Sequence, residues 1–145
     1  MFGYVVENVI TDETLEKQLS ESGVVYDFMT IKLDGSGDNV NVVLQDLGVL
    51  YGTILKTEAL LKQTESQLKQ MFATMGYPDV KLTQENIMFA GAERPSFLVE
   101  LELSGAKLYE RQIMIRQDQY LCAVTATSTG SDKTDEELEL FYPLS

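Results

Sequence analysis

The sequence predicts an α+β domain in which an antiparallel sheet is accompanied by helices. Two observations favour this class. The second half of the chain holds short segments of alternating apolar and polar residues joined by brief turns, as in an antiparallel meander. An earlier segment instead carries apolar residues at helical spacing. A length of 145 residues fits one domain, so we expect residues 1–145 to form a single unit.

The first third of the chain predicts a strand, a short helix and a hairpin. Residues 2–10 are rich in β-favouring side chains, and Thr11 then offers a helix cap ahead of Leu15 and Leu19, which lie one turn apart. We expect that helix to end near Gly23. Residues 24–33 and 40–47 predict two strands, because residues 34–39 between them have the glycine, aspartate and asparagine content of a hairpin turn.

The clearest helix spans residues 57–75. Two Glu–Lys pairs one turn apart support it, and its apolar positions form one stripe that we expect to pack in the core. Gly76 is placed to end the helix, and Pro78 follows. The stripe comprises Leu60, Leu61, Leu68, Met71, Phe72 and Met75.

The rest of the chain predicts strands and a terminal helix. We expect strands at residues 80–82 and 86–90, with residues 83–85 between or within them, and then a turn at residues 91–95. Strands follow at residues 97–103, 108–116 and 120–128, with tight turns between them. Thr134 and Glu137 match a capping box, so a short helix should run from Thr134 through Phe141 and stop at Pro143.

Composition excludes several classes of function. The chain has no histidine, which removes Ser-His-Asp triads, Cys-His dyads and His-ligated metal centres. Its 23 acidic residues against 11 basic ones give a net charge of −12, the wrong sign for binding nucleic acid. No apolar stretch approaches the roughly 20 residues of a membrane span. No signal peptide is visible at the start of the chain, and removal of a leader from a longer precursor stays open.

One segment resembles a calcium loop. Residues 34–39 alternate oxygen-bearing side chains with glycine, which suits a hard cation. The EF-hand template fails, however, because its sixth position is Asn39 instead of glycine and its twelfth is Gln45 instead of glutamate. We therefore interpret the segment as a hairpin turn.

Other candidate residues favour structural roles. Glu100 and Glu102 share one face of a strand, where a solvated surface is more typical than a paired-carboxylate site. Cys122 lies in an apolar run and is expected to be a small buried core residue. No phosphate-binding glycine motif occurs. We predict no catalytic, cofactor-binding or metal-binding residue and leave partner-binding residues unassigned. The tyrosines are too scattered to define a site: Tyr4, Tyr26, Tyr51, Tyr77, Tyr109, Tyr120 and Tyr142.

The order of elements resembles the Mog1/PsbP-like domains, and among them small bacterial exported proteins or lipoproteins of unknown function. Residues 38–46, 109–121 and 125–128 leading to 135–143 carry the resemblance. It implies an α/β/α sandwich, no enzymatic activity, no cofactor, and a role in binding or assembly at the cell envelope. Plant members serve photosystem II and the yeast member serves nuclear transport, but this chain offers no matching functional residues.

Three hypotheses follow. The first is a non-enzymatic binding or assembly protein, extracellular or associated with the cell envelope, whose partner is an unknown protein or small ligand. The second is an intracellular adaptor that binds another protein through its acidic surface. The third and most remote is an enzyme that uses carboxylates and tyrosines. A pocket that groups carboxyl groups of raised pKa would favour the third.

Overall fold

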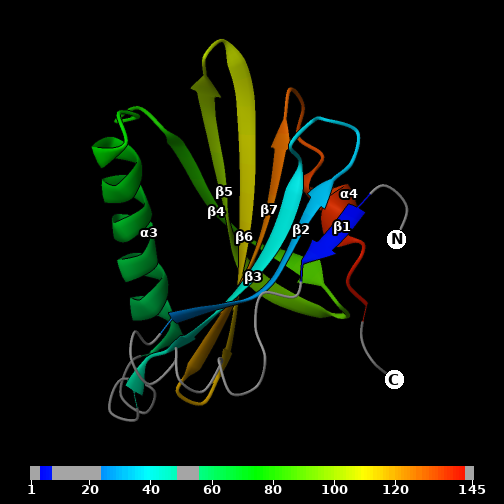
Figure 1. Cartoon of the computed structure of the whole chain (residues 1–145). Coiled ribbons are helices and arrows are strands. Elements are labelled where there is room, and N and C mark those ends of the chain that lie inside the picture. Colours follow the sequence, from blue (N-terminus) through cyan, green and yellow to red (C-terminus); the bar gives the residue numbers. More distant parts are fainter. Residues whose placement is uncertain (1–3, 8–23, 49–55, 143–145) are drawn as a thin grey trace.

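The fold is an antiparallel sheet accompanied by helices (Figure 1). The computed structural model describes residues 4–7, 24–48 and 56–142, with side chains described from Thr30 onward. Within these residues seven strands run in the order β1-β2-β3-β7-β6-β5-β4, and each neighbouring pair is antiparallel. The elements are β1 (Tyr4–Glu7), β2 (Val24–Lys32), β3 (Asn39–Asp46), α3 (Thr57–Thr74), β4 (Lys81–Phe89), β5 (Ala92–Leu103), β6 (Ala106–Gln117), β7 (Tyr120–Thr129) and α4 (Thr134–Leu138).

Most predicted elements are confirmed, with one turn in the wrong place. Strands β2 and β3 form the predicted hairpin, and β5, β6 and β7 form the predicted meander. The predicted turn at residues 91–95 is wrong, because β5 begins at Ala92 and the connection is the tight turn at Ala90 and Gly91. Residues 81–89 form one strand, so residues 83–85 lie within a strand, which is one of the two predicted alternatives. The helix predicted at residues 11–22 lies outside the described residues.

Helix α3 ends as its sequence predicts. Gly76 has a φ of 97°, its N–H donates to the carbonyl of Ala73, and the N–H of Tyr77 donates to the carbonyl of Phe72. These two bonds form a Schellman motif, which needs a left-handed residue at the Gly76 position. The prediction that Met71 and Met75 belong to the core is wrong, since their exposed fractions are 45% and 61%. Met75 is the C-cap residue of α3, and it lies beyond Phe72, the last residue of the helix that is buried.

Alternation along the strands gives the sheet two faces. The α3 face carries a buried cluster that α3 completes, and the α4 face carries another that α4 completes. The α3-face cluster comprises Leu60, Leu68, Phe72, Phe97, Val99, Met114 and Leu121. The α4-face cluster comprises Val40, Val42, Phe89, Ile113, Val124, Ala126 and Leu138.

The helices occupy opposite sides of the sheet but only part of each. In Figure 1, α3 stands at the left of the strands, and α4 lies at the right. Helix α4 has five residues and contacts β7, β3 and β6. The predicted antiparallel sheet is therefore confirmed, whereas complete helical layers on both faces, as in an α/β/α sandwich, stay a prediction.

Candidate functional site

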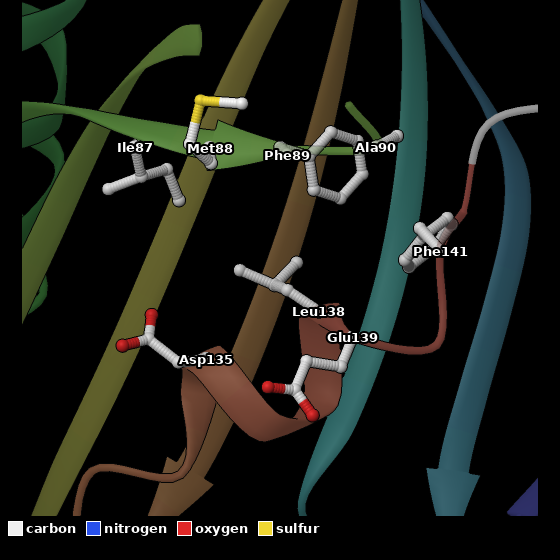
Figure 2. A pocket seen from close by; sticks show the side chains of 8 residues that line it. All are labelled: Ile87, Met88, Phe89, Ala90, Asp135, Leu138, Glu139 and Phe141. Carbon is white, nitrogen blue, oxygen red and sulfur yellow. The ribbon is translucent and has the colours of Figure 1, made fainter. Parts of the chain in front are cut away.

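A cavity of about 430 Å³ lies between the end of β4 and α4 (Figure 2). Residues 87–90 form one wall, and Asp135, Leu138, Glu139 and Phe141 form the other. We call it the β4–α4 cavity. Its size falls within the range of about 300–1,000 Å³ that is typical of ligand pockets. Six of its eight lining residues are apolar and two are carboxylates, so it offers an apolar interior with an acidic contribution.

The strand wall of this cavity is the edge of β4. Side chains alternate between faces along a strand, so a wall made of four consecutive residues must include the backbone edge. Strand β4 is last in the strand order and pairs only with β5 in the described sheet. The edge away from β5 therefore has no strand neighbour among the described residues. Edge strands present unpaired backbone N–H and C=O groups.

The β4–β5 hairpin reaches this position because its tip leaves the sheet. The β5–β6 ladder begins at Ser96, so residues 92–95 pair with β4 alone. Ala90 and Gly91 have φ values of 48° and 82°, which gives the primed turn that tight hairpins favour. Pro95 belongs to the β4–β5 ladder and lies just outside the β5–β6 ladder, so its missing N–H interrupts no bond to β6.

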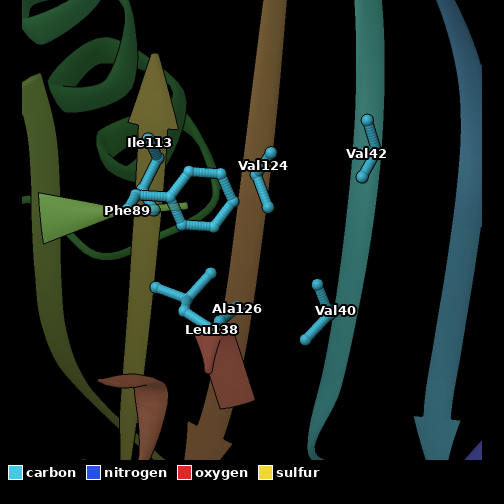
Figure 3. Close-up of a cluster of buried hydrophobic side chains, with 7 residues drawn as sticks. All are labelled: Val40, Val42, Phe89, Ile113, Val124, Ala126 and Leu138. Carbon is cyan, nitrogen blue, oxygen red and sulfur yellow. The ribbon is translucent and has the colours of Figure 1, made fainter. Parts of the chain in front are cut away.

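Packing of Phe89 holds the hairpin tip over the α4 face. In Figure 3 the end of β4 crosses β6, and the Phe89 ring lies beside Ile113 and Val124, with which it shares the buried cluster. The same ring lies 5.4 Å from that of Phe141, centroid to centroid. These contacts fix the distance between β4 and the chain after α4, and so keep the cavity open between them.

The two carboxylates of the cavity come from one side of α4. Asp135 and Glu139 are four residues apart, which places them one above the other on a helix. Asp135 is exposed, and its Oδ1 lies 3.4 Å from Nε of Arg111. Arg111 is only 4% exposed and is bound more closely by Glu85, with an Nη1–Oε1 distance of 2.7 Å. Because Glu85 already neutralises the guanidinium of Arg111, the carboxylates of Asp135 and Glu139 leave a net negative charge at the cavity.

A second group of polar residues lies behind α4. Asp38 is fully buried and accepts two bonds, from the backbone N–H of Thr129 at 3.0 Å and from Nζ of Lys133 at 2.6 Å. The hydrogen bond with Asp38 raises the pKa of the Lys133 ammonium. Glu137 is 3% exposed, and neither of its carboxylate oxygens has a hydrogen-bond partner. Burial, with Asp38 adding to it, raises the pKa of Glu137 to about 8.

The predicted capping box is wrong. Thr134 is the first residue of α4, and its hydroxyl donates to Oδ1 of Asp132 at 2.6 Å and accepts a bond from Arg111. Asp132 also accepts the N–H of Thr134, and the N-cap residue, Lys133, makes no side-chain capping bond. Glu137 accordingly does not reach back to the helix start but is buried beneath the helix. The helix itself ends at Leu138, earlier than predicted.

The suspected calcium loop is a hairpin turn. The side chain of Asp34 accepts the N–H of Ser36, and that of Ser36 accepts the N–H of Asp38. Gly35 and Gly37 have φ values of 81° and 80°. The side chains of Asp34 and Ser36 are thus bonded within the turn, and Asp34 also forms an ion pair with Lys32. The side chain of Asp38 instead bonds Thr129 and Lys133. No cluster of metal-ligating residues occurs in the described ranges.

Glu100 and Glu102 lie away from the β4–α4 cavity. They help to line a second cavity of about 280 Å³ together with Tyr109, and Glu100 is bound to Lys81 with an Nζ–Oε2 distance of 2.6 Å. The hydrogen bond with Glu100 raises the pKa of Lys81. Glu102 is exposed, which fits the predicted solvated face for that residue.

Cys122 and the tyrosines do not form a site in the described residues. Cys122 is half-buried and packs against the α4-face cluster, so it contacts the core as predicted, but the prediction of a buried residue overstates its burial. Tyr77 packs against the α3-face cluster, whereas Tyr120 and Tyr142 are exposed. Tyr51 lies outside the described residues, and the side chains of Tyr4 and Tyr26 are not described.

The two carboxyl groups of raised pKa do not share a cavity. Burial raises the pKa of Glu110, which pairs in register with Val99 and therefore lies on the α3 face. Glu137 lies on the α4 face and does not line the β4–α4 cavity. The grouping of shifted carboxyl groups that would favour the enzyme hypothesis is not present among these residues.

Sequence reasoning missed the residues of the β4–α4 cavity. It treated residues 87–90 as part of a strand, and Leu138 and Phe141 as the apolar side of a helix. The one local signal was the acidic run from Asp135 to Glu139, which is typical of a solvated surface and leaves a cationic partner or divalent cations as the alternative. The cavity arises where the hairpin tip and α4 meet, which no local pattern encodes.

Comparison with known proteins establishes the fold. No protein-family model and no curated protein matches the chain. The solution structure of cyanobacterial PsbP (CyanoP) from Synechocystis sp. PCC 6803 is similar, with a TM-score of 0.58 at 12% identity, over 96% of this chain and 76% of that one. The chain has the PsbP-like fold. The fold is the one that the resemblance in the sequence predicted. At 12% identity the likeness extends to the fold alone.

Two further solved structures are more distant. One is a protein of unknown function, PA94 from Pseudomonas aeruginosa, described as a putative regulator, with a TM-score of 0.45 and 18% identity over 81% of this chain and 74% of that one. The other is LpqN, described as involved in cell envelope biogenesis of Mycobacterium tuberculosis, with a TM-score of 0.44 and 6% identity over 94% of this chain and 76% of that one.

In the described part of this chain, no helix has the length and apolar character needed to cross a membrane.

Proposed function

We propose that this PsbP-like protein is a non-enzymatic binding or assembly protein of the cell envelope, and that the β4–α4 cavity receives its partner. The observation that carries the proposal is the cavity itself: about 430 Å³, apolar on both walls, with two carboxylates on one helix face. Binding sites typically combine a largely apolar concave surface with a few polar groups that orient the ligand.

The envelope location and the finer architecture are supported by the resemblance in the sequence. Residues 38–46 and 109–121, with the acidic C-terminal segment, resemble exported Mog1/PsbP-like proteins. The same resemblance supports a single domain over residues 1–145 and an α/β/α sandwich. The α3 and α4 clusters on opposite faces of the sheet are consistent with that arrangement.

Site-specific photo-crosslinking tests the proposal. A photoreactive residue replaces Glu139 in the full-length protein, expressed in its native organism, and a matched variant carries it at Met75 on α3, which is 61% exposed. We expect a discrete adduct from position 139 that is absent from position 75 and fractionates with the cell envelope. Adducts of the same kind from both positions would overturn the assignment of the site.

Binding of the purified adduct partner then tests the cavity wall. Phe141→Ala removes an aromatic wall and should weaken binding about tenfold, because apolar anchors dominate binding free energy. Tyr142→Ala is the matched control, since Tyr142 is the next residue, is 75% exposed and does not line the cavity. Equal affinities of the two variants, measured by titration calorimetry, would argue against the site.

Cell fractionation separates this proposal from the intracellular adaptor. The adaptor hypothesis is favoured by the acidic surface of α4, where Asp135, Glu136 and Glu139 are exposed. It predicts the same adduct in the cytoplasmic fraction. Recovery of the adduct only from that fraction would therefore replace the envelope location while leaving the binding site in place.

A further inference from the structure

We propose that the β4–α4 cavity receives an extended, basic segment of a partner protein, which adds a strand to the free edge of β4. This inference rests on the proposed function and specifies the partner's chemistry and the mode of binding. Three separate features of the described residues support it: an open strand edge, an apolar slot beside that edge, and two carboxylates across the slot.

The open edge provides backbone hydrogen bonds. Strand β4 has nine residues, ends the strand order and is exposed along Thr83 to Asn86. Every second residue of an edge strand directs its N–H and C=O away from the sheet, where another extended chain can pair with them. Peptide recognition by strand addition uses such an edge for affinity and neighbouring pockets for specificity.

The slot provides a place for an apolar side chain. Figure 2 shows Leu138 directed from α4 toward β4, with Ile87 and Phe89 on the strand side. A strand that paired with β4 would direct alternate side chains toward the α4 face, and those side chains would enter the cavity between the hairpin tip and the helix. The Phe89 and Phe141 rings, 5.4 Å apart, close one end of that slot.

The carboxylates select a basic segment. Asp135 and Glu139 line the cavity, and no basic residue does. Arg111, the base bound to Asp135, is held more closely by Glu85, and Arg94 stands opposite Ile87 in register without lining the cavity. A lysine or arginine of the partner therefore completes the charge balance. The chain's net charge of −12 disfavours a second copy as the occupant, since like charges oppose association.

The test uses three synthetic peptides and full-length protein. The probe is a fluorescent heptapeptide, Val-Thr-Lys-Thr-Val-Thr-Lys, in which valine and lysine occupy the one face that can point toward α4 and threonine occupies the other. One analogue replaces each lysine by glutamate, and the other carries N-methyl groups on alternate residues. We expect the glutamate analogue to bind at least about tenfold more weakly, because it places like charges together. The N-methylated analogue should also lose about tenfold, because it cannot donate to the edge of β4.

Variants of α4 identify the site. Glu139→Gln should weaken binding of the lysine–valine peptide by about three- to tenfold and reduce its salt dependence. Glu136→Gln is the matched control, because Glu136 is exposed on the same helix and does not line the cavity. Hydrogen exchange should show new protection of backbone amides in residues 84–89 when the peptide is bound.

The outcomes separate this inference from the proposed function. Equal binding of the N-methylated peptide would overturn strand addition, and equal binding of the glutamate peptide would overturn the basic specificity. Equal effects of Glu139→Gln and Glu136→Gln would place the peptide elsewhere. If the crosslinked partner binds at position 139 through a helix or an acidic segment, the binding function stands and this inference fails. Loss of the position-specific adduct contradicts the proposed function itself.

Discussion

The two faces of the sheet differ in what they bury. On the α3 face the buried cluster joins the helix to the strands through apolar side chains such as Phe72 and Phe97. On the α4 face an apolar cluster lies beside buried charges. The three buried charged residues of the described chain, Asp38, Arg111 and Glu137, are all on that side. The α3 face thus contributes packing, whereas the α4 face combines packing with polar interactions.

This difference explains why the cavity lies on the α4 face. Apolar side chains can close against each other in any orientation, whereas buried polar groups need partners at fixed distances and angles. Arg111 is held by Glu85 of β4 and by Thr134 at the start of α4, so it spans the hairpin and the helix. It sets their separation, and the space left beyond it is the β4–α4 cavity. Stability and recognition are therefore divided between the faces.

The largest expected loss of stability comes from a substitution on the α3 face. Phe97→Ala should lower the free energy of unfolding by about 4 kcal/mol, because Phe97 is fully buried and its removal leaves a cavity among close-packed neighbours. Met75→Ala is the control and should change stability by less than about 0.5 kcal/mol, since Met75 is mostly exposed. Urea denaturation measures both. A loss under about 1 kcal/mol for Phe97→Ala would show that this face is not the tightly packed one.

A smaller but still large effect is expected at Asp38. Asp38→Ala should lower the free energy of unfolding by about 3 kcal/mol, because it leaves the N–H of Thr129 and the ammonium of Lys133 without their buried acceptor. Asp34→Ala, in the same turn but exposed, should lower the denaturation midpoint much less than Asp38→Ala does. Similar denaturation midpoints for the two variants would mean that the buried ion pair between Asp38 and Lys133 does not stabilise the α4 face.

Local signals in the sequence predicted the α3 face better than the α4 face. The stripe from Leu60 to Phe72, the Gly76 stop and the alternation from Phe97 to Leu103 depend on neighbours within a few residues, and each predicts the observed element. Met71 and Met75 show the limit, since helical spacing identifies a stripe but not how far the sheet extends beneath it.

The α4 face depends on contacts between residues far apart in the chain. The capping box failed because the hydroxyl of Thr134 bonds Asp132 and Arg111, and Arg111 lies 23 residues earlier. The cavity could not be predicted because it requires the hairpin tip at Ala90 to cross the sheet toward Phe141. The turn predicted at residues 91–95 extended to Pro95, although a proline fits within β5 at a position beyond the end of its ladder with β6.

The last expected effect concerns how the stability of the α4 face depends on pH. Glu137 has a pKa of about 8 in the folded protein, against an ordinary value of 4.5. Between these two pH values the unfolded chain releases a proton that the folded protein keeps, so this group makes the protein less stable as pH rises through that window. Glu137→Gln removes the titration. Its stability advantage over the natural protein should be near zero at pH 4.5 and should grow steadily as the pH rises to 8.

Denaturation curves at several pH values check this prediction. Glu136→Gln is the control, because Glu136 is exposed on the same helix and should show no such growth between pH 4.5 and 8. The charged groups that act on Glu137 are Asp38 and Asp132, which favour its neutral form, and Lys133 and Lys32, which oppose it. A constant difference between Glu137→Gln and the natural protein across this range would show that Glu137 ionises at its ordinary pKa. An ordinary pKa would mean that burial costs the charged form no more than the neutral form, so the carboxylate of Glu137 would have to gain a hydrogen-bond partner on the α4 face.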